Sequence, residues 1–270
     1  MTPHSPVQPS PVPREPRKPN AIIPVTIADD LTFADLRAAL AAGWRDFAAY
    51  PAYGFFFAAI YALGGAALVY GLAITGEGWW MLPMVAGFPL LAPFAAVGLY
   101  EVSRRREEGL PLSWGAILGA LRGRDNDQVM MMGGIIFIAF TFWLGLAHGI
   151  FAIFLGESGI GTSSGELLFS PQALLMYLIG GTIGALFAFG LYAITVITLP
   201  MLIDRDVDFI TAIITSLATI RANKKAMIGW ALMIAMLLVI AMIPAFLGLF
   251  IALPVLGHAT WHLYRRVVSD

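Results

Sequence analysis

The chain has 270 residues, of which 59% are hydrophobic and 12% are charged. This composition excludes an ordinary soluble domain, and the continuous apolar stretches exclude a β-barrel, so the fold class is an all-α polytopic membrane protein. The formal net charge of −1 offers no electrostatic footprint for nucleic acid, and the absence of cysteine excludes disulfides, thiolate catalysis and iron–sulfur clusters.

Residues 1–30 read as a disordered, Pro-rich tail on the cytoplasmic side. They lack the apolar core of a signal peptide. A solvated tail and a proline segment that docks on a partner's aromatic groove both fit this composition. The remaining residues, 31–270, are expected to form one transmembrane domain.

An amphipathic helix is expected to follow the tail. Thr32 can cap it, with Asp35 at the third position of a capping box. Apolar residues then recur at helical spacing, so we expect an interface helix with this stripe facing lipid or the bundle. The stripe consists of Leu36, Leu40, Trp44 and Phe47.

Six transmembrane helices are expected, because each apolar stretch is close to the roughly 20 residues that cross a bilayer. The stretches are 52–74, 79–100, 129–155, 172–203 and the two halves of 226–264, which divide near Pro244. The second stretch contains three prolines, which predict kinks whose freed carbonyls need partners. Small-residue pairs predict close helix packing at Gly145/Gly149 and at Gly180/Gly184.

The basic residues predict the orientation. If the N-terminus is inside, segments 1–50, 101–128, 204–225 and 265–270 are cytoplasmic and contain all 16 Lys and Arg residues of the chain. Cytoplasmic loops of membrane proteins are enriched in these residues, so both termini are expected to be cytoplasmic. The protein is expected to lie in the bacterial inner membrane.

An internal threefold repeat is also predicted. When Asp35 is aligned with Asp208, the apolar stripe of the first interface helix falls on that of a helix over 208–223, and a fainter match lies near Leu112. The unit would be interface helix, span, span, and the copies would be 32–110, 111–206 and 207–270. The alternative is that any amphipathic helix next to an apolar stretch aligns this well.

Several residue groups, in order, resemble the DUF2189 family of bacterial integral membrane proteins of unknown function, over about residues 30–268. The resemblance implies a multi-pass membrane fold. Some family members carry a cytochrome c oxidase label, which implies at most a respiratory association. The matching groups include Gly43-Trp44, Asp46-Phe47, Gly98-Leu99-Tyr100-Glu101, Ser103-Arg104-Arg105, Asp204-Arg205, Trp230-Ala231, Gly257-His258 and Trp261-His262.

Three histidines are candidate functional residues. His148 lies within the third span, where an ionisable group is costly, and serves either function or a hydrogen bond between helices. His258 and His262 share one face of the last helix at a spacing that suits a divalent metal, but they need further ligands, and Glu101 could supply one. Haem ligation by His148 and His258 is disfavoured because their expected depths differ by about 20 Å. We therefore assign no cofactor and no metal.

Charged side chains at the cytoplasmic face form the other candidate group. They serve either as salt bridges at the helix ends or as a site for anionic lipid or a partner, in which case the clusters 104–106 and 224–225 would bind it. The candidates are Glu101, Arg104, Arg105, Asp204, Arg205 and Asp208.

No nucleophile–base set or phosphate-binding loop is evident, so the protein is expected not to be an enzyme. We expect an accessory or binding protein of a membrane complex, and the family label would make that complex a respiratory one. The alternative is a small-solute transporter or channel, which needs polar groups at mid-depth.

Overall fold

The computed structural model describes residues 25–75, 80–120, 128–155, 170–244 and 246–269. Within these ranges the regular structure is helical except for two short strands, β1 (Thr26–Ile27) and β2 (Val268–Ser269), which pair antiparallel. The sequence-predicted tail lies outside the described residues up to residue 24. Its last residues carry β1 and are therefore attached to the helical domain.

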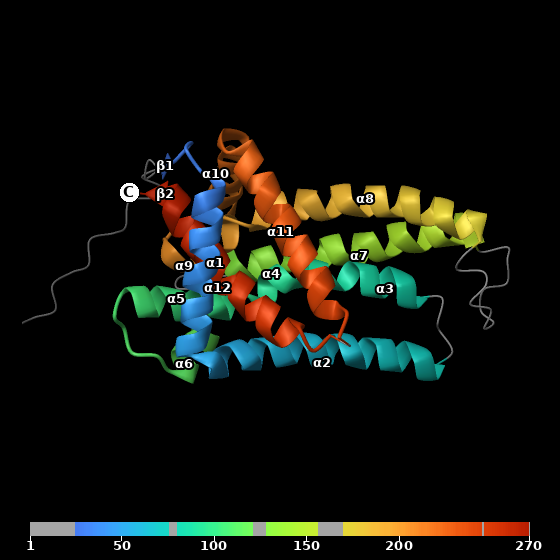
Figure 1. The fold of residues 1–270 in the computed structure, drawn as a ribbon, viewed down its shortest axis with the longest axis horizontal. Helices are drawn as coiled ribbons and strands as arrows, with labels where there is room; N and C mark the ends of the chain where they lie inside the picture. The colour runs from blue at the N-terminus through green and yellow to red at the C-terminus, as the bar shows by residue number, and fades with distance from the viewer. Residues whose placement is uncertain (1–24, 76–79, 121–127, 156–169, 245, 270) are drawn as a thin grey trace, which may run out of the picture.

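Four helical segments are long and apolar enough to cross a membrane. They are α2 (Pro51–Thr75), α7 (Gln128–Leu155), α8 (Pro171–Thr195) with α9 (Thr198–Asp204), and α11 (Lys224–Met242). In Figure 1, α2, α7 and α8 run along the long axis of the molecule. Most of α2, α7 and α11 is not buried inside the protein. The prediction of an all-helical membrane protein with several apolar helices is confirmed.

The other two predicted spans are built differently. The second is divided into α3 (Met81–Gly87), the 3-10 helix η2 (Phe88–Leu91), α4 (Ala92–Ala95) and α5 (Val97–Glu107). The sixth is α12 (Leu249–Val267), whose C-terminal half is largely buried and ends in Arg265 and Arg266. Neither is a single apolar helix of spanning length, so four of the six spans are supported and the count of six stays a prediction.

The proline kinks are compensated as expected. Pro93 has no N–H, and Ala92 donates to the carbonyl of Pro89 in a 3-10 arrangement. The Phe88 carbonyl, which Ala92 would otherwise reach, accepts a hydrogen bond from the Tyr61 hydroxyl of α2 at 2.8 Å. The second predicted span, α3 to α5, is called the second leg below. One of its backbone carbonyls is therefore bonded to a side chain of α2.

A side chain also explains the break between α8 and α9. The Ser216 hydroxyl of α10 (Phe209–Ala222) donates to the Ala193 carbonyl at 2.7 Å and accepts from the Ile197 backbone N–H at 3.4 Å. These two backbone groups are four residues apart and would bond to each other in a continuous helix. Ser216 thus inserts into the helical ladder, which is a recognised cause of a kink.

Helix α1 (Phe33–Ala49) lies across the long-axis helices and packs closely on α12 (Figure 1). The predicted capping box of Thr32 and Asp35 is present. Contact with α12 is close because Gly43 has no side chain: a Cβ there would lie 2.6 Å from the backbone N of Ala259. Of the predicted stripe, Leu36 and Phe47 are buried, whereas Trp44 is 52% exposed because the face against α12 runs through Gly43.

The buried face of α10 also differs from the predicted apolar stripe. Ala212, Thr215, Ser216 and Thr219 are buried, whereas Phe209 and its stripe partners are half-buried. Small side chains let α10 approach α8 and α9 closely. In the middle copy of the predicted repeat, the expected helix is represented by the short α6 (Trp114–Gly119), and residues 121–127 lie outside the described chain.

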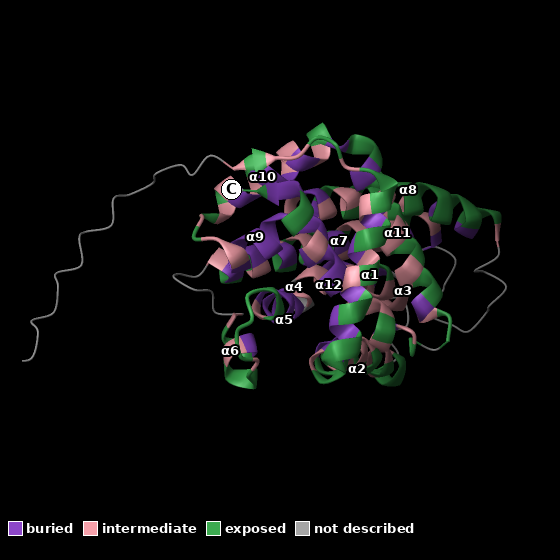
Figure 2. Cartoon of the chain, turned by 60° about the vertical axis from the view of Figure 1, so that its left-hand side comes forward, coloured by how far each residue is buried: buried purple, intermediate pink, exposed green. Residues whose placement is uncertain are grey.

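The core lies at one end of the molecule. Figure 2 shows buried residues concentrated in α5, α9 and α12, whereas α2 and the far half of α8 are mainly exposed. The two chain ends meet here through β1 and β2, and Asn223 binds the N-terminal segment by donating to the Ala28 carbonyl and accepting from the Leu31 N–H. This packing leaves the apolar helices free to face lipid.

Candidate functional site

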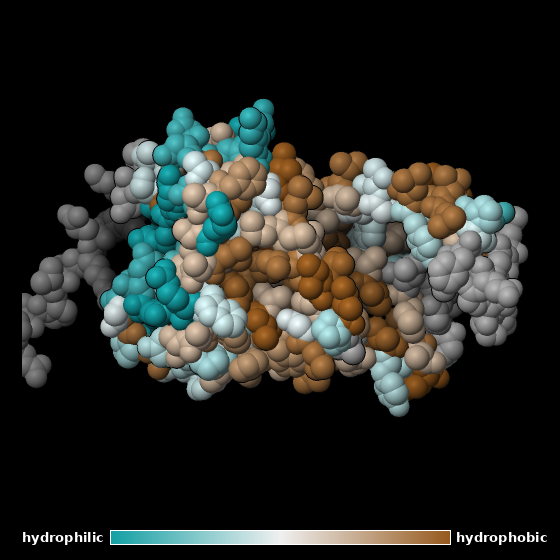
Figure 3. Space-filling view, in the orientation of Figure 1, coloured by the Kyte–Doolittle hydropathy of each residue, from teal (hydrophilic) through white to brown (hydrophobic). Residues whose placement is uncertain are grey.

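The candidate site is the charged end of the molecule, which we call the polar end. It is formed by α1, α5, α9, α10, the first turn of α11 and the last turns of α12. Figure 3 shows hydrophilic side chains gathered here, next to a broad hydrophobic surface over the remaining helices. The described parts of the long apolar helices beyond this end carry no Lys, Arg, Asp or Glu. The polar end is therefore where charged side chains can meet.

Asp46 is the centre of a buried cluster that joins α1 to α5 and α12. It is 4% exposed and accepts hydrogen bonds from the Ser103 hydroxyl at 2.6 Å and His262 Nε2 at 2.8 Å. It also pairs with Arg106. The sequence did not reveal this acid as the partner of His262, because 216 residues separate them.

His258 extends this cluster through Ser103. Its Nδ1 lies 2.7 Å from Ser103 Oγ. The single hydroxyl hydrogen of Ser103 already points to Asp46, so we assign the Nδ1–H of His258 as the donor to Ser103. Because Ser103 is buried and its proton is held by Asp46, the chain Asp46–Ser103–His258 cannot present a nucleophile to a substrate in the way of a catalytic triad.

Electrostatics favour the charged form of Asp46. Burial acts to raise the pKa of this carboxyl, but hydrogen bonds from His262 and Ser103, together with the charge of the imidazoles, hold the pKa below its ordinary value of 3.8. A buried carboxylate with these donors is a structural link between three helices.

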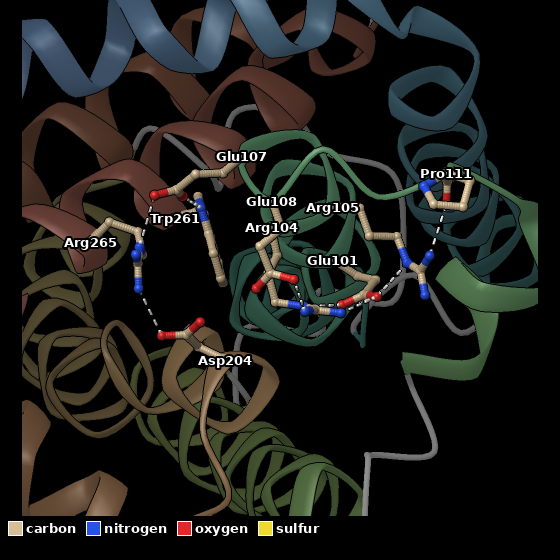
Figure 4. Close-up of polar contacts among 9 residues, drawn as sticks. All are labelled: Glu101, Arg104, Arg105, Glu107, Glu108, Pro111, Asp204, Trp261 and Arg265. Atoms are coloured by element: carbon tan, nitrogen blue, oxygen red, sulfur yellow. Dashed lines mark hydrogen bonds and ion pairs between the residues drawn. The ribbon is translucent and has the colours of Figure 1, made fainter. Parts of the chain in front are cut away.

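Glu101 neutralises two arginines of the 104–106 cluster. Arg104 donates from Nε and Nη2 to the two oxygens of Glu101, both at 2.8 Å, and Arg105 Nε donates to Oε1 at 2.6 Å (Figure 4). Arg104 also contacts Glu108, and Arg105 donates to the Pro111 carbonyl. The Glu101 hydrogen bonds raise the pKa of Arg104. Glu101 is thus not a ligand beside the histidines.

A second network joins α9, α5 and α12. Arg265 of α12 bridges Asp204 and Glu107, each at 3.1 Å, and Glu107 accepts from Trp261 Nε1 at 3.0 Å (Figure 4). Asp204 also accepts from the Tyr264 hydroxyl at 2.6 Å. The predicted salt bridges at helix ends are therefore present here, as an arrangement that holds the helices together.

Arg205 and Asp208 have separate local roles. Arg205 lies 3.7 Å from Asp204 and donates to Tyr264. Asp208 caps α10 by accepting from the Thr211 backbone and hydroxyl, and these hydrogen bonds lower its pKa. The predicted pairing of Arg205 is thus formed with Asp204, and Asp208 serves as a helix cap.

His148 lies apart from the polar end. It is 20 residues along α7 from Gln128, about 30 Å by helical rise, and its ring stacks on Trp80 at 4.3 Å between centroids. The neighbouring Gly145 and Gly149 have nothing within 4 Å of an added Cβ, so the close packing predicted there is wrong. Gly184, in contrast, packs against Trp143. The described residues contain no group of three or more His, Cys, Asp or Glu that could hold a metal.

Two cavities lie among the apolar helices. One, of about 320 Å³, is lined by residues of α3, α7 and α8, including Trp143 and Gly184. The other, of about 360 Å³, lies between α2, the kinked second leg and the turn before α12, and includes Tyr61 and Phe88. The hydroxyl of Tyr61 is already bonded to Phe88, so the second cavity offers an apolar lining. Neither cavity is lined by a histidine or a charged residue.

Comparisons with known proteins bear on the family alone. No curated protein and no solved structure matches the chain. One protein-family model does match, and it covers α3 through α9, including the Glu101 cluster. The resemblance of the flanking segments, with α1 and α12, stays a prediction. Over residues 81–204 this chain matches DUF2189, the family described as a predicted integral membrane protein.

Proposed function

We propose that this integral membrane protein is a non-catalytic accessory protein of the bacterial inner membrane that binds another membrane complex, with its polar end in the cytoplasm. The observation that carries this proposal is the self-contained polar end. Its buried acids and most of its arginines bond to each other and hold helices together, as in the Asp46 and Asp204 networks. This leaves exposed surface, rather than an internal site, as the part that acts.

The charge distribution supports the orientation. All 16 Lys and Arg residues lie in the four segments assigned to the cytoplasm, and the segments assigned to the other side of the membrane contain only acidic residues among the charged types. The meeting of the two chain ends in the β1–β2 pair supports placing both on one side of the membrane.

The order of elements supports six crossings and a threefold repeat. A short helix, a long apolar helix and a returning helical leg follow one another as α1–α2–α5, as α6–α7–α8 and as α10–α11–α12. The copies differ in how the returning leg is built, because prolines divide it in the first and Ser216 breaks it in the second.

The apolar cavities argue against transport of a polar solute. A transporter places polar groups around its site near mid-depth. The two cavities described above have apolar linings, and His148 lies outside both sets of lining residues. Uptake of a solute by vesicles containing only this protein, lost on His148→Ala, would favour the transporter alternative instead.

The absence of cysteine allows a direct test of topology. Single cysteines at Ser164, Leu247 and Ser269 would be treated with a membrane-impermeant maleimide in intact cells. Labelling of S164C and L247C but not S269C is the expected result. Labelling of S269C would contradict the proposed orientation. Failure of L247C to label would contradict the fifth and sixth membrane crossings.

The accessory role is tested by purification in mild detergent with mass spectrometry. A membrane protein recovered in stoichiometric amount and retained through size-exclusion chromatography is the expected result. Recovery of the protein alone, under conditions that preserve other membrane complexes of the same cells, would contradict the accessory role without affecting the topology.

A further inference from the structure

The basic side chains of the polar end divide into two sets. Arginines of α5, the α9 end and α12 are engaged in ion pairs with Glu101, Asp46, Asp204 and other acids. A second set is exposed and forms no ion pair within the described residues. Its members are Arg37, Arg45, Arg221, Lys224 and Lys225.

Two of these lie on the outward face of α1. Arg37 and Arg45 are eight residues apart, which is about 12 Å along the helix. The same helix exposes Phe33 (57%) and Trp44 (52%). Its two acids are held elsewhere, because Asp46 is buried and Asp35 bonds to Thr32 and Arg266. The outward face therefore carries basic and aromatic side chains among alanines, and neither acid of α1 is free to neutralise its charge.

The other three lie where α10 leads into α11. Lys224 and Lys225 occupy the first turn of α11, a candidate span, and Arg221 precedes them. The Phe33 ring packs against Gly229, 2.5 Å from the position of an added Cβ. Lys225 is one helical turn before Gly229, on the same side of α11, so this end of α11 adjoins the start of α1.

We infer that the outward face of α1 and the first turn of α11 form a binding surface for the headgroups of anionic phospholipids. Clustered basic residues at the end of a span attract the negatively charged headgroups of anionic lipid, and aromatic rings favour the level of the headgroups. The helix lies across the long-axis helices, next to the hydrophobic surface, as an interface helix does (Figures 1 and 3). The charge complements the phosphodiester of the lipid.

This surface differs in part from the lipid-binding site predicted from the sequence, which consisted of residues 104–106 and 224–225. Arg104, Arg105 and Arg106 were candidates for lipid binding, but their side chains are engaged by Glu101, Asp46 and Glu108. Lys224 and Lys225 remain from that prediction, and the α1 arginines are added to them. The inference rests on the protein being in a membrane. It needs neither the accessory role nor a particular orientation.

The test measures lipid preference in nanodiscs. The purified protein would be reconstituted in phosphatidylcholine containing a minor fraction of phosphatidylglycerol, and the lipids adjoining it would be counted by native mass spectrometry after release. Enrichment of phosphatidylglycerol is expected for the wild type. Each neutralised residue should reduce the preference by about fivefold, as for a basic residue near an anionic membrane surface.

The variant R37Q/R45Q/K224Q/K225Q should lose the enrichment. The matched control R37K/R45K/K224R/K225R keeps the charge at the same positions and should retain it. Thermal melting of both variants reports whether the fold is intact. Enrichment that persists in the folded neutral variant overturns the inference, and so does loss of enrichment in the folded charge-preserving variant.

Asp29 provides an independent measurement. It is exposed and adjoins Ala28, whose carbonyl binds Asn223 next to Lys224. Removing its charge with D29N should increase phosphatidylglycerol enrichment, because one repelling carboxylate is lost near the surface. A decrease would contradict the assigned charge complementarity. Failure of all these outcomes leaves the accessory role, which is tested by copurification, unaffected.

Discussion

The Ser103 hydroxyl donates to the Asp46 carboxylate at 2.6 Å, and this contact joins α1 to α5. The same carboxylate also accepts a hydrogen bond from His262 of α12 and forms an ion pair with Arg106 of α5. Asp46 of α1 therefore links three helices through its contacts with α5 and α12. These contacts allow quantitative predictions for substitutions of Asp46.

Asp46→Asn should destabilise the fold. The substitution keeps the shape of the side chain but removes the charge that His262 and Arg106 face. Loss of one partner from a partly buried pair costs about 2–3 kcal/mol. The expected result is a lower midpoint of unfolding in detergent, with unfolding monitored by tryptophan fluorescence. Asp29→Asn, which changes an exposed acid, serves as the control, and equal midpoints for the two variants would contradict the role of Asp46.

The contribution of Asp46 should depend on pH. Its pKa in the folded protein is below the ordinary value of 3.8, so its stabilisation is present above that value and is lost as the pH falls through the folded pKa. The difference in unfolding midpoint between wild type and D46N should thus be full near neutral pH and shrink below about pH 4. A difference that stays constant into acid would show that the charge of Asp46 is not what stabilises the cluster.

Gly43→Ala should weaken the packing of α1 on α12. The new Cβ would lie 2.6 Å from both the Ala259 backbone N and the Val255 carbonyl, and backbone cannot move aside as a side chain can. Overpacking of this kind costs about 1–3 kcal/mol. Thermal unfolding measures it. Gly134→Ala in α7, which has open space around the added Cβ, is the control and should be neutral or stabilising by up to about 1 kcal/mol.

Tyr61→Phe should destabilise the kinked second leg. The change removes the hydroxyl that donates to the Phe88 carbonyl in an apolar region. Loss of such a hydrogen bond costs about 0.5–1.5 kcal/mol. Tyr70→Phe is the control because Tyr70 is 69% exposed on the same helix. Equal unfolding midpoints for the two variants would mean that the carbonyl has another partner.

Local features of the fold could be predicted from the sequence, because they depend on neighbouring residues. The capping box of Thr32 and Asp35 and the need of the proline kinks for new partners are of this kind. Continuous apolar stretches of spanning length likewise identified four helices of the membrane region.

Contacts between distant residues could not be predicted. No signal near His262 indicated Asp46, and the sequence suggested Glu101 instead, because side chains one or two turns apart on a helix are the only partners that spacing reveals. The insertion of Ser216 between Ala193 and Ile197 likewise depends on how α10 docks. The sequence left open whether the apolar stripe of α1 faces lipid or the bundle, and it did not show that Gly43 lies against α12 while Trp44 is exposed.

The position of α12 has a consequence for biosynthesis. It is synthesised long after α1, which packs along it, and Asp46 receives His262 only after 216 further residues have been made. The β1–β2 pair also waits for residues 268–269. Until α12 has been made, α1 therefore lacks its main packing partner, and the carboxylate of Asp46 lacks its imidazole.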